Sequence, residues 1–449
     1  MDRLSELDKA PVGKLLWKYS LPAVVGIVVM SIYNVIDRIF IGHGVGPDAI
    51  AGLAITFPVM NISAAFGVLV GAGASSRTSI VLGMGDRPQA QLVLGNSIVM
   101  TLVFGTFYIG MLWLFLDPIL RLFGASDVSL PYAHDFMLYL LPGLLMNNLS
   151  YSYSNVMRAT GYPTKAMVAM FIGAGLNLIL APIFIFGLHW GIKGAAIATD
   201  IAMFISALFV MCHFISSKSE IHFTKGTYRL QRRILLPVLA IGSAPCIVNT
   251  AGCIINGIIN NTIYRYGGDS AVAAMGIFTT YTHLIVTFIL GVCMGMQPIV
   301  GYNYGARQYH RLRHVFWLTV AVCTVASVIG TLLSQFVPHL IARMFTSDAH
   351  LIATSKMALS LTMLMFWSVG FQIVSTNFFQ SIGEVKKSIF MSFSRQVLFL
   401  IPCLFILPMF LELRGVWLAF PVGDLVAFLM AIVLLIHQMH KFRASAPQP

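Results

Sequence analysis

The chain has 449 residues, of which 58% are hydrophobic and only 10% are charged, and its mean hydropathy is +0.84. Soluble domains carry about 25% charged residues, so this composition excludes an ordinary water-soluble protein. The net charge of +12 does not indicate a nucleic-acid partner, because the basic residues lie in short gaps between apolar runs, without a basic patch and interleaved aromatic residues.

Catalytic and metal-binding motifs are absent from the sequence. There is no HExxH, GxSxG, P-loop or paired acidic metal motif. The six cysteines lie singly in apolar runs, outside any CxxC or Cys/His pattern. We therefore expect neither an enzyme nor a protein with a bound cofactor.

In chain order, twelve runs reach the roughly 20 largely apolar residues that a membrane helix needs. They cover residues 15–41, 49–82, 93–116, 130–157, 164–188, 194–215, 234–264, 270–300, 314–338, 350–382, 388–410 and 415–438. The longest polar stretch, residues 216–233, falls between the sixth and seventh runs. This pattern predicts an N-lobe over residues 1–215 with helices 1–6, a cytoplasmic linker over 216–233, and a C-lobe over 234–449 with helices 7–12.

The basic residues also predict the orientation. If the N-terminus is inside, eighteen Lys and Arg residues fall in cytoplasmic segments and five in outer loops. Because short cytoplasmic loops carry the excess of Lys and Arg, we expect both termini in the cytoplasm.

The two halves of the chain repeat each other at an offset of about 222 residues. Pro22 answers Pro245, and Asn155 answers Asn377 at the end of the fourth run of each half. Since six helices separate the copies, both halves have the same orientation. The expected fold is all-α, with twelve transmembrane helices in two pseudo-twofold related six-helix bundles. Parallel repeats of this kind are typical of transporters that rock two bundles about a central cavity.

Several stretches resemble the multidrug and toxic compound extrusion (MATE) family. They are NVIDRIFIGHGVG at 34–46, NLILAPIFIFG at 177–187, GIKGAAIAT at 191–199, GYNYGARQYHRL at 301–312 and SRQVLFLIP at 394–402. The resemblance implies a MATE/MOP-type fold and export of amphipathic, often cationic compounds, driven by inward flow of protons or sodium. It also implies a bacterial inner-membrane protein.

Three carboxylates lie clearly inside the predicted helices: Asp37, Asp200 and Asp424. An intramembrane carboxylate costs about 2.5–3.5 kcal/mol on insertion scales, so it commonly faces a cavity or partner and marks an ion pathway. Arg38 is a poor partner for Asp37, because adjacent residues on a helix do not face each other. We expect Asp37 to bind the coupling ion.

Three further polar residues of the N-lobe fall at a similar predicted depth. Asn177 on helix 5, with Thr199 and Asp200 on helix 6, lies in the same outer half as Asp37, so the four residues can converge. Their oxygens suit Na⁺, and burial of the carboxylate equally suits a proton carrier. The residues leave H⁺ and Na⁺ both open, with Asp37 as the candidate sodium ligand.

One position departs from the family pattern. Where the family often has an Asp four residues after the Asn of NLILAPIF, this chain has Ala181. Two hypotheses follow: Asp200 substitutes for the missing acid, or Asp200 points elsewhere and the site has one carboxylate.

Helix 1 presents Met30, Tyr33 and Asn34 on the face that carries Asp37, at i, i+3, i+4 and i+7. Met170 and Met203 fall where the resemblance to the DinF-like subgroup implies a drug cavity, and methionine adapts to varied ligands. Since the chain has 24 methionines, simple packing is the alternative for these two.

The C-lobe differs from the NorM-like subgroup, which places acidic residues in helices 7 and 10. Here helix 7 has Asn256, Asn260 and Asn261 and no carboxylate, so the chain resembles the DinF-like subgroup. Asn260, Arg395 and Asp424 are the polar candidates of the C-lobe. A structural role is favoured for Asp424, and a direct pair with Arg395 is left open because the two are predicted at different depths.

The function expected from these features is secondary active antiport of organic cations and drugs, by alternating access of two lobes in a lipid bilayer. The expected protein is a monomer. The nearest alternative is a flippase for lipids or lipid-linked saccharides of the same superfamily. Such proteins often carry extra spans and a cationic cavity, and neither is obvious in the sequence.

Overall fold

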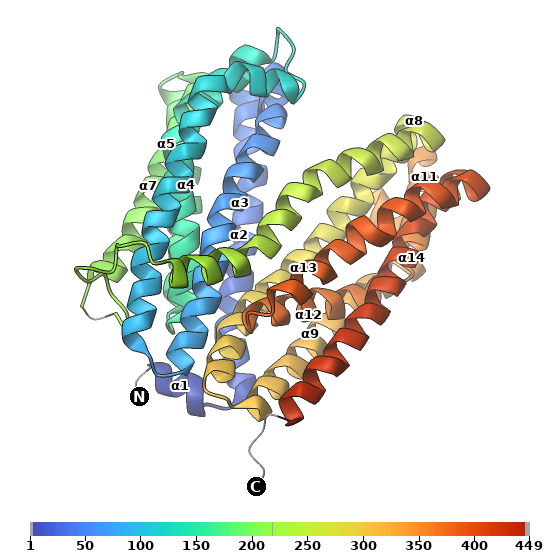
Figure 1. The fold of residues 1–449 in the computed structure, drawn as a ribbon. Coiled ribbons are helices and arrows are strands. Elements are labelled where there is room, and N and C mark those ends of the chain that lie inside the picture. The colour runs from blue at the N-terminus through green and yellow to red at the C-terminus, as the bar shows by residue number, and fades with distance from the viewer. Residues whose placement is uncertain (1–2, 218, 445–449) are drawn as a thin grey trace. The chain divides into compact units, whose positions relative to one another are not determined.

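The structure is a computed structural model that describes residues 3–217 and 219–444, and within them every regular element is a helix (Figure 1). The first half contains α1 (Arg3–Lys9), α2 (Val12–Gly44), α3 (Pro47–Gly83), α4 (Arg87–Leu122), α5 (Leu130–Ala159), α6 (Pro163–Pro182), the π-helix η1 (Ile183–Gly187) and α7 (Gly191–Ile215). The second half contains α8 (Arg232–Gly305), α9 (Tyr309–Phe336), α10 (Pro338–Arg343), α11 (Ala349–Thr362), the 3-10 helix η2 (Phe366–Ser368), α12 (Val369–Ser381), α13 (Val385–Phe393), the π-helix η3 (Ser394–Leu400) and α14 (Ile401–Ala444).

These helices correspond to the twelve predicted spans. Among the described residues, eight helices are long and apolar enough to cross a membrane, and a ninth span is α11 with α12, a pair bent by 52°. Two of the eight contain a break in helical geometry, at Gly268 (φ 62°) and at Glu412 (φ 51°), and each therefore supplies two predicted spans. The remaining span is α5, which has 30 residues but is more polar than the others.

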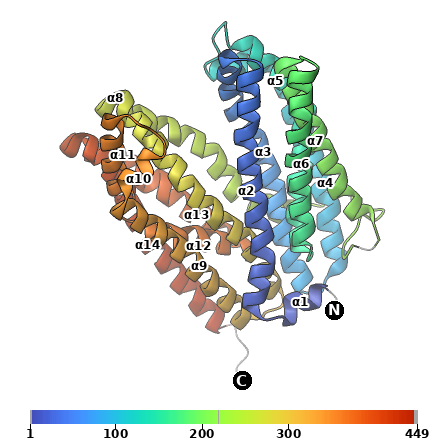
Figure 2. The ribbon, with the colours of Figure 1, turned by 180° about the vertical axis from the view of Figure 1, so that it is seen from behind.

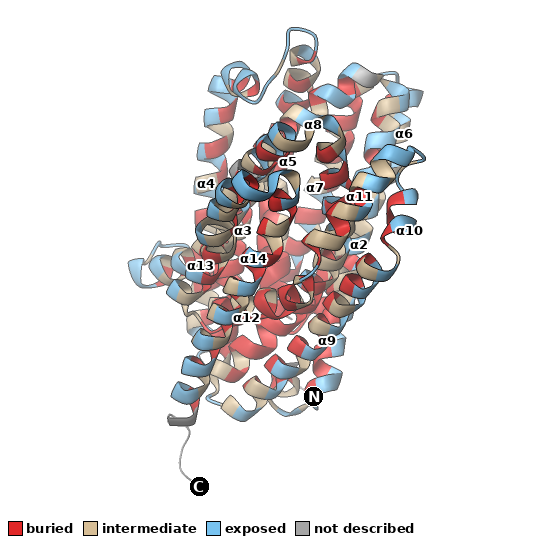
Figure 3. Cartoon of the chain, turned by 90° about the vertical axis from the view of Figure 1, so that its right-hand side faces the viewer, coloured by how far each residue is buried: buried red, intermediate tan, exposed pale blue. Residues whose placement is uncertain are grey.

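The described chain divides into two compact units, each with its own apolar core. The first unit contains the residues up to Ala10 together with Leu21–Thr250, and the second contains Pro11–Ser20 with the residues from Ala251 onward. The core of the first unit is built mainly from α3, α4, α5 and α7, and that of the second from α8, α11, α12 and α14. Buried residues, red in Figure 3, follow the faces along which these helices pack.

Large apolar side chains are nevertheless exposed in both units. Phe107 and Trp113 on α4, and Met409 and Val433 on α14, are each more than half exposed. In a water-soluble protein, exposed apolar patches of this kind mark surfaces that contact another protein or a membrane. The membrane supplies that contact here, because the same helices have the length and hydropathy of membrane spans.

Glycine and proline determine where neighbouring helices begin and end. Gly161 follows α5 with φ 93°, a left-handed conformation that glycine adopts without a Cβ penalty. Pro163 begins α6, where its missing N–H is not needed. The same two residues therefore end one membrane helix and begin the next.

Proline also adjoins both π-helices. Pro182 is the last residue before η1. Pro402 is the second residue of α14, which begins directly after η3. A proline inside a helix leaves a carbonyl of the preceding turn without its N–H partner, and wider π-type bonding is one way in which a helix accommodates such a defect. The two π-helices lie in the fifth span of the first half and its repeat, the eleventh span.

The segment predicted as a linker is non-helical from Ser216 to Gln231 in the part that the structure describes. Asn96 on α4 holds it in place: the Asn96 amide donates to the Thr227 carbonyl at 2.9 Å and accepts from the Gln231 N–H at 2.8 Å.

Candidate ion-coupling site and polar pocket

The first unit places the middle of α2 beside the middle of α6. A Cβ on Gly26 would lie 2.8 Å from Met170 Sδ, and a Cβ on Gly44 would lie 2.2 Å from Ile185 Cγ2. These two close approaches fix a parallel register between α2 and the continuous helix formed by α6 and η1. Figure 2 shows α2, α6 and α7 in this unit. In this register the polar part of α2 lies level with Asn177 and Ala181.

Three of the predicted site residues interact at this level. Asn177 Nδ2 donates to Thr199 Oγ1 at 2.7 Å, and the Thr199 hydroxyl donates to the Ala195 carbonyl at 2.9 Å. The Tyr33 side chain lies beside Thr199. Residues of α2, α6 and α7 therefore meet in one polar cluster inside the first bundle. Asn177 and Thr199 were predicted for the ion site, whereas Tyr33 was predicted for the cavity face of α2.

Asp37 lies one turn after Tyr33 on α2 and is only 8% exposed. Its Oδ1 is buried and has no hydrogen-bond partner among the described residues. Within the described part of the chain Asp37 forms no ion pair with Arg38, whose guanidinium lies 5.6 Å from the Phe57 ring centroid. An unpaired buried carboxylate oxygen is costly, so this position favours binding of a proton or a cation.

The Asn177 side-chain oxygen is a second buried acceptor without a partner in the described part of the chain. Since the Asn177 amide group is already bonded to Thr199, its oxygen faces away from that bond. A hard cation binds carboxylate, amide and hydroxyl oxygens, so Asp37, Asn177, Thr199 and Tyr33 supply a suitable donor set. Among the described residues no cluster of three His, Cys, Asp or Glu side chains is found, so the donor set does not resemble a transition-metal site.

Asp200 is placed elsewhere, although it follows Thr199 directly. Its carboxylate lies against Gly143 on α5, where a Cβ would come within 1.9 Å of Asp200 Oδ1. Successive residues of an α-helix point about 100° apart, so Thr199 faces α6 while Asp200 faces α5. Of the two hypotheses about the acid absent at Ala181, which is fully buried, this placement favours the one in which Asp200 points elsewhere.

The close approach at Gly143 leads to a stability prediction. Gly143→Ala is expected to lower the free energy of unfolding by about 1–3 kcal/mol, because the new methyl group overpacks the α5–α7 contact. Thermal unfolding of the purified protein measures this. Gly110→Ala on α4 is the matched control, since a Cβ there meets no atom within 4 Å, and it should be neutral or stabilising. Equal effects of the two substitutions would contradict the packing.

The predicted cavity residues have different surroundings. Met170 packs against Gly26, and Met203 packs against the apolar core of the first unit, so packing describes both contacts. Asn34 is exposed and donates to the Met30 carbonyl of its own helix at 2.8 Å, whereas Met30 is partly buried. Only Tyr33 of the predicted cavity face joins the polar cluster.

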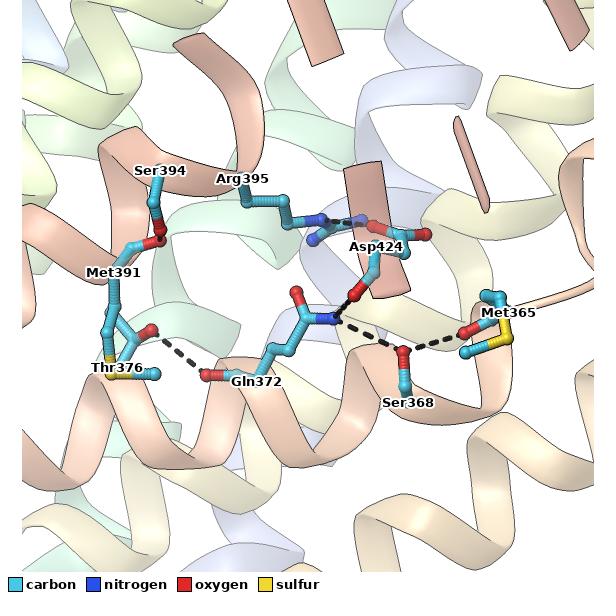
Figure 4. A network of polar contacts seen from close by, with 8 residues as sticks. All are labelled: Met365, Ser368, Gln372, Thr376, Met391, Ser394, Arg395 and Asp424. Atoms are coloured by element: carbon cyan, nitrogen blue, oxygen red, sulfur yellow. Dashed lines mark hydrogen bonds and ion pairs between the residues drawn. The ribbon is translucent and has the colours of Figure 1, made fainter. Parts of the chain in front are cut away.

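In the second unit, Arg395 and Asp424 form the ion pair that the sequence left open. Arg395 Nε donates to Asp424 Oδ1 at 2.8 Å (Figure 4). Gln372 on α12 holds the backbone of Asp424 in place. Its Nε2 donates to the Asp424 backbone carbonyl at 2.8 Å and to Ser368 Oγ at 3.2 Å. Asn260 is exposed on α8 and does not line the same pocket as the pair.

The pair forms part of the wall of a pocket of about 200 Å³ in the second unit. Most of the wall is apolar, and it comes mainly from α8, η3 and α14, with hydroxyl and amide groups between the apolar side chains. The lining residues are Gly252, Ile255, Asn256, Ile259, Met275, Phe278, Thr279, Thr282, Val286, Thr362, Phe366, Arg395, Gln396, Leu400, Phe420, Gly423 and Asp424. Sequence reasoning missed this pocket and its support by Gln372, because apolar side chains in membrane helices carry no distinguishing pattern.

Comparison with known proteins agrees with this architecture. The MatE family model matches residues 22–183 and again 245–406, one match in each repeat. The chain is 25% identical to the multidrug export protein MepA of Staphylococcus aureus (strain MSSA476) over 434 residues, covering 97% of this chain and 96% of MepA.

Two solved structures are similar over nearly the whole chain. The MATE multidrug transporter DinF-BH is 35% identical, with a TM-score of 0.87 and coverage of 94% of this chain and 95% of DinF-BH. An outward-facing multidrug resistance MATE transporter of the MOP superfamily is 25% identical, with a TM-score of 0.90 and coverage of 98% of both chains.

The repeated helical units and their buried polar clusters define a twelve-helix membrane transporter. The chain belongs to the MatE family, that is, to the MATE transporters. The predicted family and all-α fold are thereby confirmed, and so is the prediction that the chain is not an enzyme, since members of this family are transporters. The identity with DinF-BH agrees with the resemblance to DinF-like members.

Proposed function

We propose that this protein is a secondary active antiporter that exports amphipathic, cationic drugs in exchange for H⁺ or Na⁺, with Asp37 as the coupling carboxylate. The observation that carries the proposal is the buried, unpartnered Oδ1 of Asp37 on α2, level with the cluster of Tyr33, Asn177 and Thr199. The names of MepA, a multidrug export protein, and of DinF-BH, a multidrug transporter, support the substrate class.

The proposed coupling uses two of the unpaired buried acceptors of the first unit, Asp37 Oδ1 and the Asn177 side-chain oxygen. A cation entering from outside neutralises Asp37 and gives the Asn177 oxygen a partner, which removes the cost of both buried groups. A ligand shifts a conformational equilibrium only by its difference in affinity between the two states. Binding of the ion is therefore proposed to be strong in one access state and weak in the other, so that ion entry drives export by alternating access of the two lobes.

The proposal extends to the setting of the protein. The excess of Lys and Arg in the segments that include both ends of the chain supports cytoplasmic termini, and the relatives from Staphylococcus support a location in a bacterial cell membrane. A monomer suffices, because both repeats are present in one chain.

Ethidium efflux from membrane vesicles containing the wild-type chain tests the proposal. A proton gradient and a sodium gradient are imposed separately, and vesicles without the protein are the control. Efflux is expected to follow one of the two gradients and to stop when an ionophore dissipates it. If neither gradient drives efflux of a cationic dye, antiport is contradicted, and translocation of a fluorescent lipid becomes the next measurement because it tests the flippase alternative.

Asp200→Asn separates the two hypotheses about the missing acid. Because Asp200 lies against Gly143 and apart from Asn177, we expect the variant to keep its ion dependence and at least about half of the wild-type efflux rate. The half-saturating ion concentration for efflux is the measurement. A large increase in that concentration would instead indicate that Asp200 does substitute for the acid absent at Ala181.

A further inference from the structure

The pocket of the second unit has a charge distribution that cation export does not explain. Its one ion pair is unequally accessible: the Arg395 side chain is 31% exposed, whereas the Asp424 side chain is 9% exposed. A solute that enters the pocket therefore meets the guanidinium before the carboxylate. Of the two charged groups in this wall, the guanidinium is therefore the more accessible.

Arg395 also keeps unused hydrogen-bond donors. A guanidinium has five N–H donors in a planar fork, and the hydrogen bond to Asp424 uses Nε only. The remaining donors suit a second carboxylate, which binds guanidinium in a bidentate manner. Asp424 meanwhile is fixed through its backbone by Gln372, as Figure 4 shows, so it remains in place when Arg395 turns to another anion.

Backbone geometry contributes to this arrangement. Arg395 and Gln396 are consecutive residues, yet both line the pocket, together with Leu400. All three belong to η3, where π-type bonding changes the angle between successive side chains relative to an α-helix. π-Helical segments occur frequently at functional sites, and here the segment directs two polar side chains toward the same cavity.

The rest of the wall suits an aromatic ring. Phe278, Phe366 and Phe420 line the pocket, and the Phe278 and Phe420 rings stack edge to face with centroids 5.5 Å apart. Aromatic side chains prefer offset or edge-to-face contacts with another ring. Thr279, Thr282 and Asn256 add hydrogen-bonding groups on α8.

We propose that the pocket of the second unit is a binding site for aromatic carboxylates, in which the ligand carboxylate binds the Arg395 guanidinium and its ring lies among Phe278, Phe366 and Phe420. The site is separate from the coupling carboxylate, since Asp37 belongs to the first unit and the pocket to the second. It extends the ligand range of the protein from cations to anions.

The test compares two probes with the same ring, 2-naphthylacetate and its neutral amide, 2-naphthylacetamide. Equilibrium dialysis against the full-length protein in lipid nanodiscs measures both, with empty nanodiscs subtracted for partition into lipid. Wild type is expected to bind the carboxylate about tenfold more tightly than the amide, as a charge-assisted bidentate contact allows. Equal binding of the two probes would overturn the proposal.

Three variants locate the effect. Arg395→Gln should remove the preference for the carboxylate while keeping amide binding, which shows that the pocket is still folded. Asp424→Asn should strengthen carboxylate binding by roughly threefold to tenfold, because Arg395 loses its competing anion. Arg343→Gln, at an exposed arginine of α10, should change neither. A preference that survives Arg395→Gln, or an Asp424→Asn variant that loses carboxylate binding as Arg395→Gln does, would contradict the site.

The outcome is independent of coupling. Asp37→Asn is expected to leave carboxylate binding unchanged while it stops gradient-driven dye efflux. Failure of antiport and failure of this binding site are therefore seen in different measurements.

Discussion

Asp37→Asn should reduce gradient-driven ethidium efflux by at least about tenfold, to a rate close to that of vesicles without the protein. The substitution keeps the size of the side chain but removes the negative charge that attracts the coupling ion, and the amide can neither carry a proton at neutral pH nor bind Na⁺ as a charged ligand. Each tenfold loss corresponds to about 1.4 kcal/mol, which is small compared with the interaction of a buried carboxylate with its cation. The initial rate of efflux under the driving gradient is the measurement.

The control for this variant is Asp127→Asn. Asp127 is exposed and forms a 3.1 Å surface pair with Arg121, and such pairs contribute little to stability. It should therefore retain wild-type efflux. Dye binding to the purified Asp37→Asn protein should also persist, so that the loss is assigned to coupling. Full gradient-driven efflux by Asp37→Asn would remove Asp37 from the mechanism.

Arg395→Leu should lower the free energy of unfolding by about 2–3 kcal/mol. The substitution leaves the Asp424 carboxylate buried without its guanidinium partner, and breaking a buried ion pair typically costs about 3–5 kcal/mol. We expect less than that range because the Arg395 side chain is 31% exposed, so solvent already screens the pair. For a unit of this size the thermal midpoint should fall by roughly 5–10 °C.

The double variant Arg395→Leu/Asp424→Leu distinguishes the charge effect from lost packing. Replacing both partners with apolar residues removes the unpaired charge, and buried ion pairs replaced in this way are often neutral or stabilising. The thermal midpoint should therefore return to within a few degrees of wild type. If the double variant is less stable than Arg395→Leu alone, the pair stabilises the unit by its packing and not through compensation of charge.

Much of the fold could be predicted from the sequence, because lipid imposes a strong and simple requirement on it. Apolar runs of about 20 residues have few alternatives to membrane helices, and the repeat predicted two halves of similar helical content. The sequence did not predict the two π-helices, nor that α11 and α12 form a bent pair. These depend on how a helix accommodates proline and packs against its neighbours, and no residue pattern encodes that directly.

The first polar cluster was partly predictable. Depth along a helix follows from counting residues, which was sufficient to bring Asn177 and Thr199 together. The direction around the helix axis follows only from packing, and for this reason the sequence did not predict that the Asp200 carboxylate lies against Gly143 on α5. Adjacent positions on α7 face different helices, so a similar depth was not enough.

In the second unit, predicted depth left a contact open that the structure contains. Arg395 and Asp424 were predicted at different depths, yet they are in contact. Arg395 lies 17 residues before the break at Glu412, and Asp424 lies 12 residues after it. Their depths along the two antiparallel helices therefore differ by about five residues, or roughly 7–8 Å at the rise of an α-helix. The long arginine side chain covers that distance, as it does when it reaches toward polar groups from within an apolar environment.

The two π-helices give each repeat one helical segment with an extra residue in its hydrogen-bonded turn. A π segment holds one residue more per hydrogen-bonded loop than an α-helix, and one residue corresponds to a rotation of about 100°. When such a segment shifts along its helix, each side chain that it passes is re-aimed by that angle while most backbone hydrogen bonds persist. In the first unit η1 directly follows the turn that contains Ala181, and in the second η3 contains Arg395 itself. A shift of either π segment would therefore rotate side chains of a polar site about the helix axis while the helix stays folded.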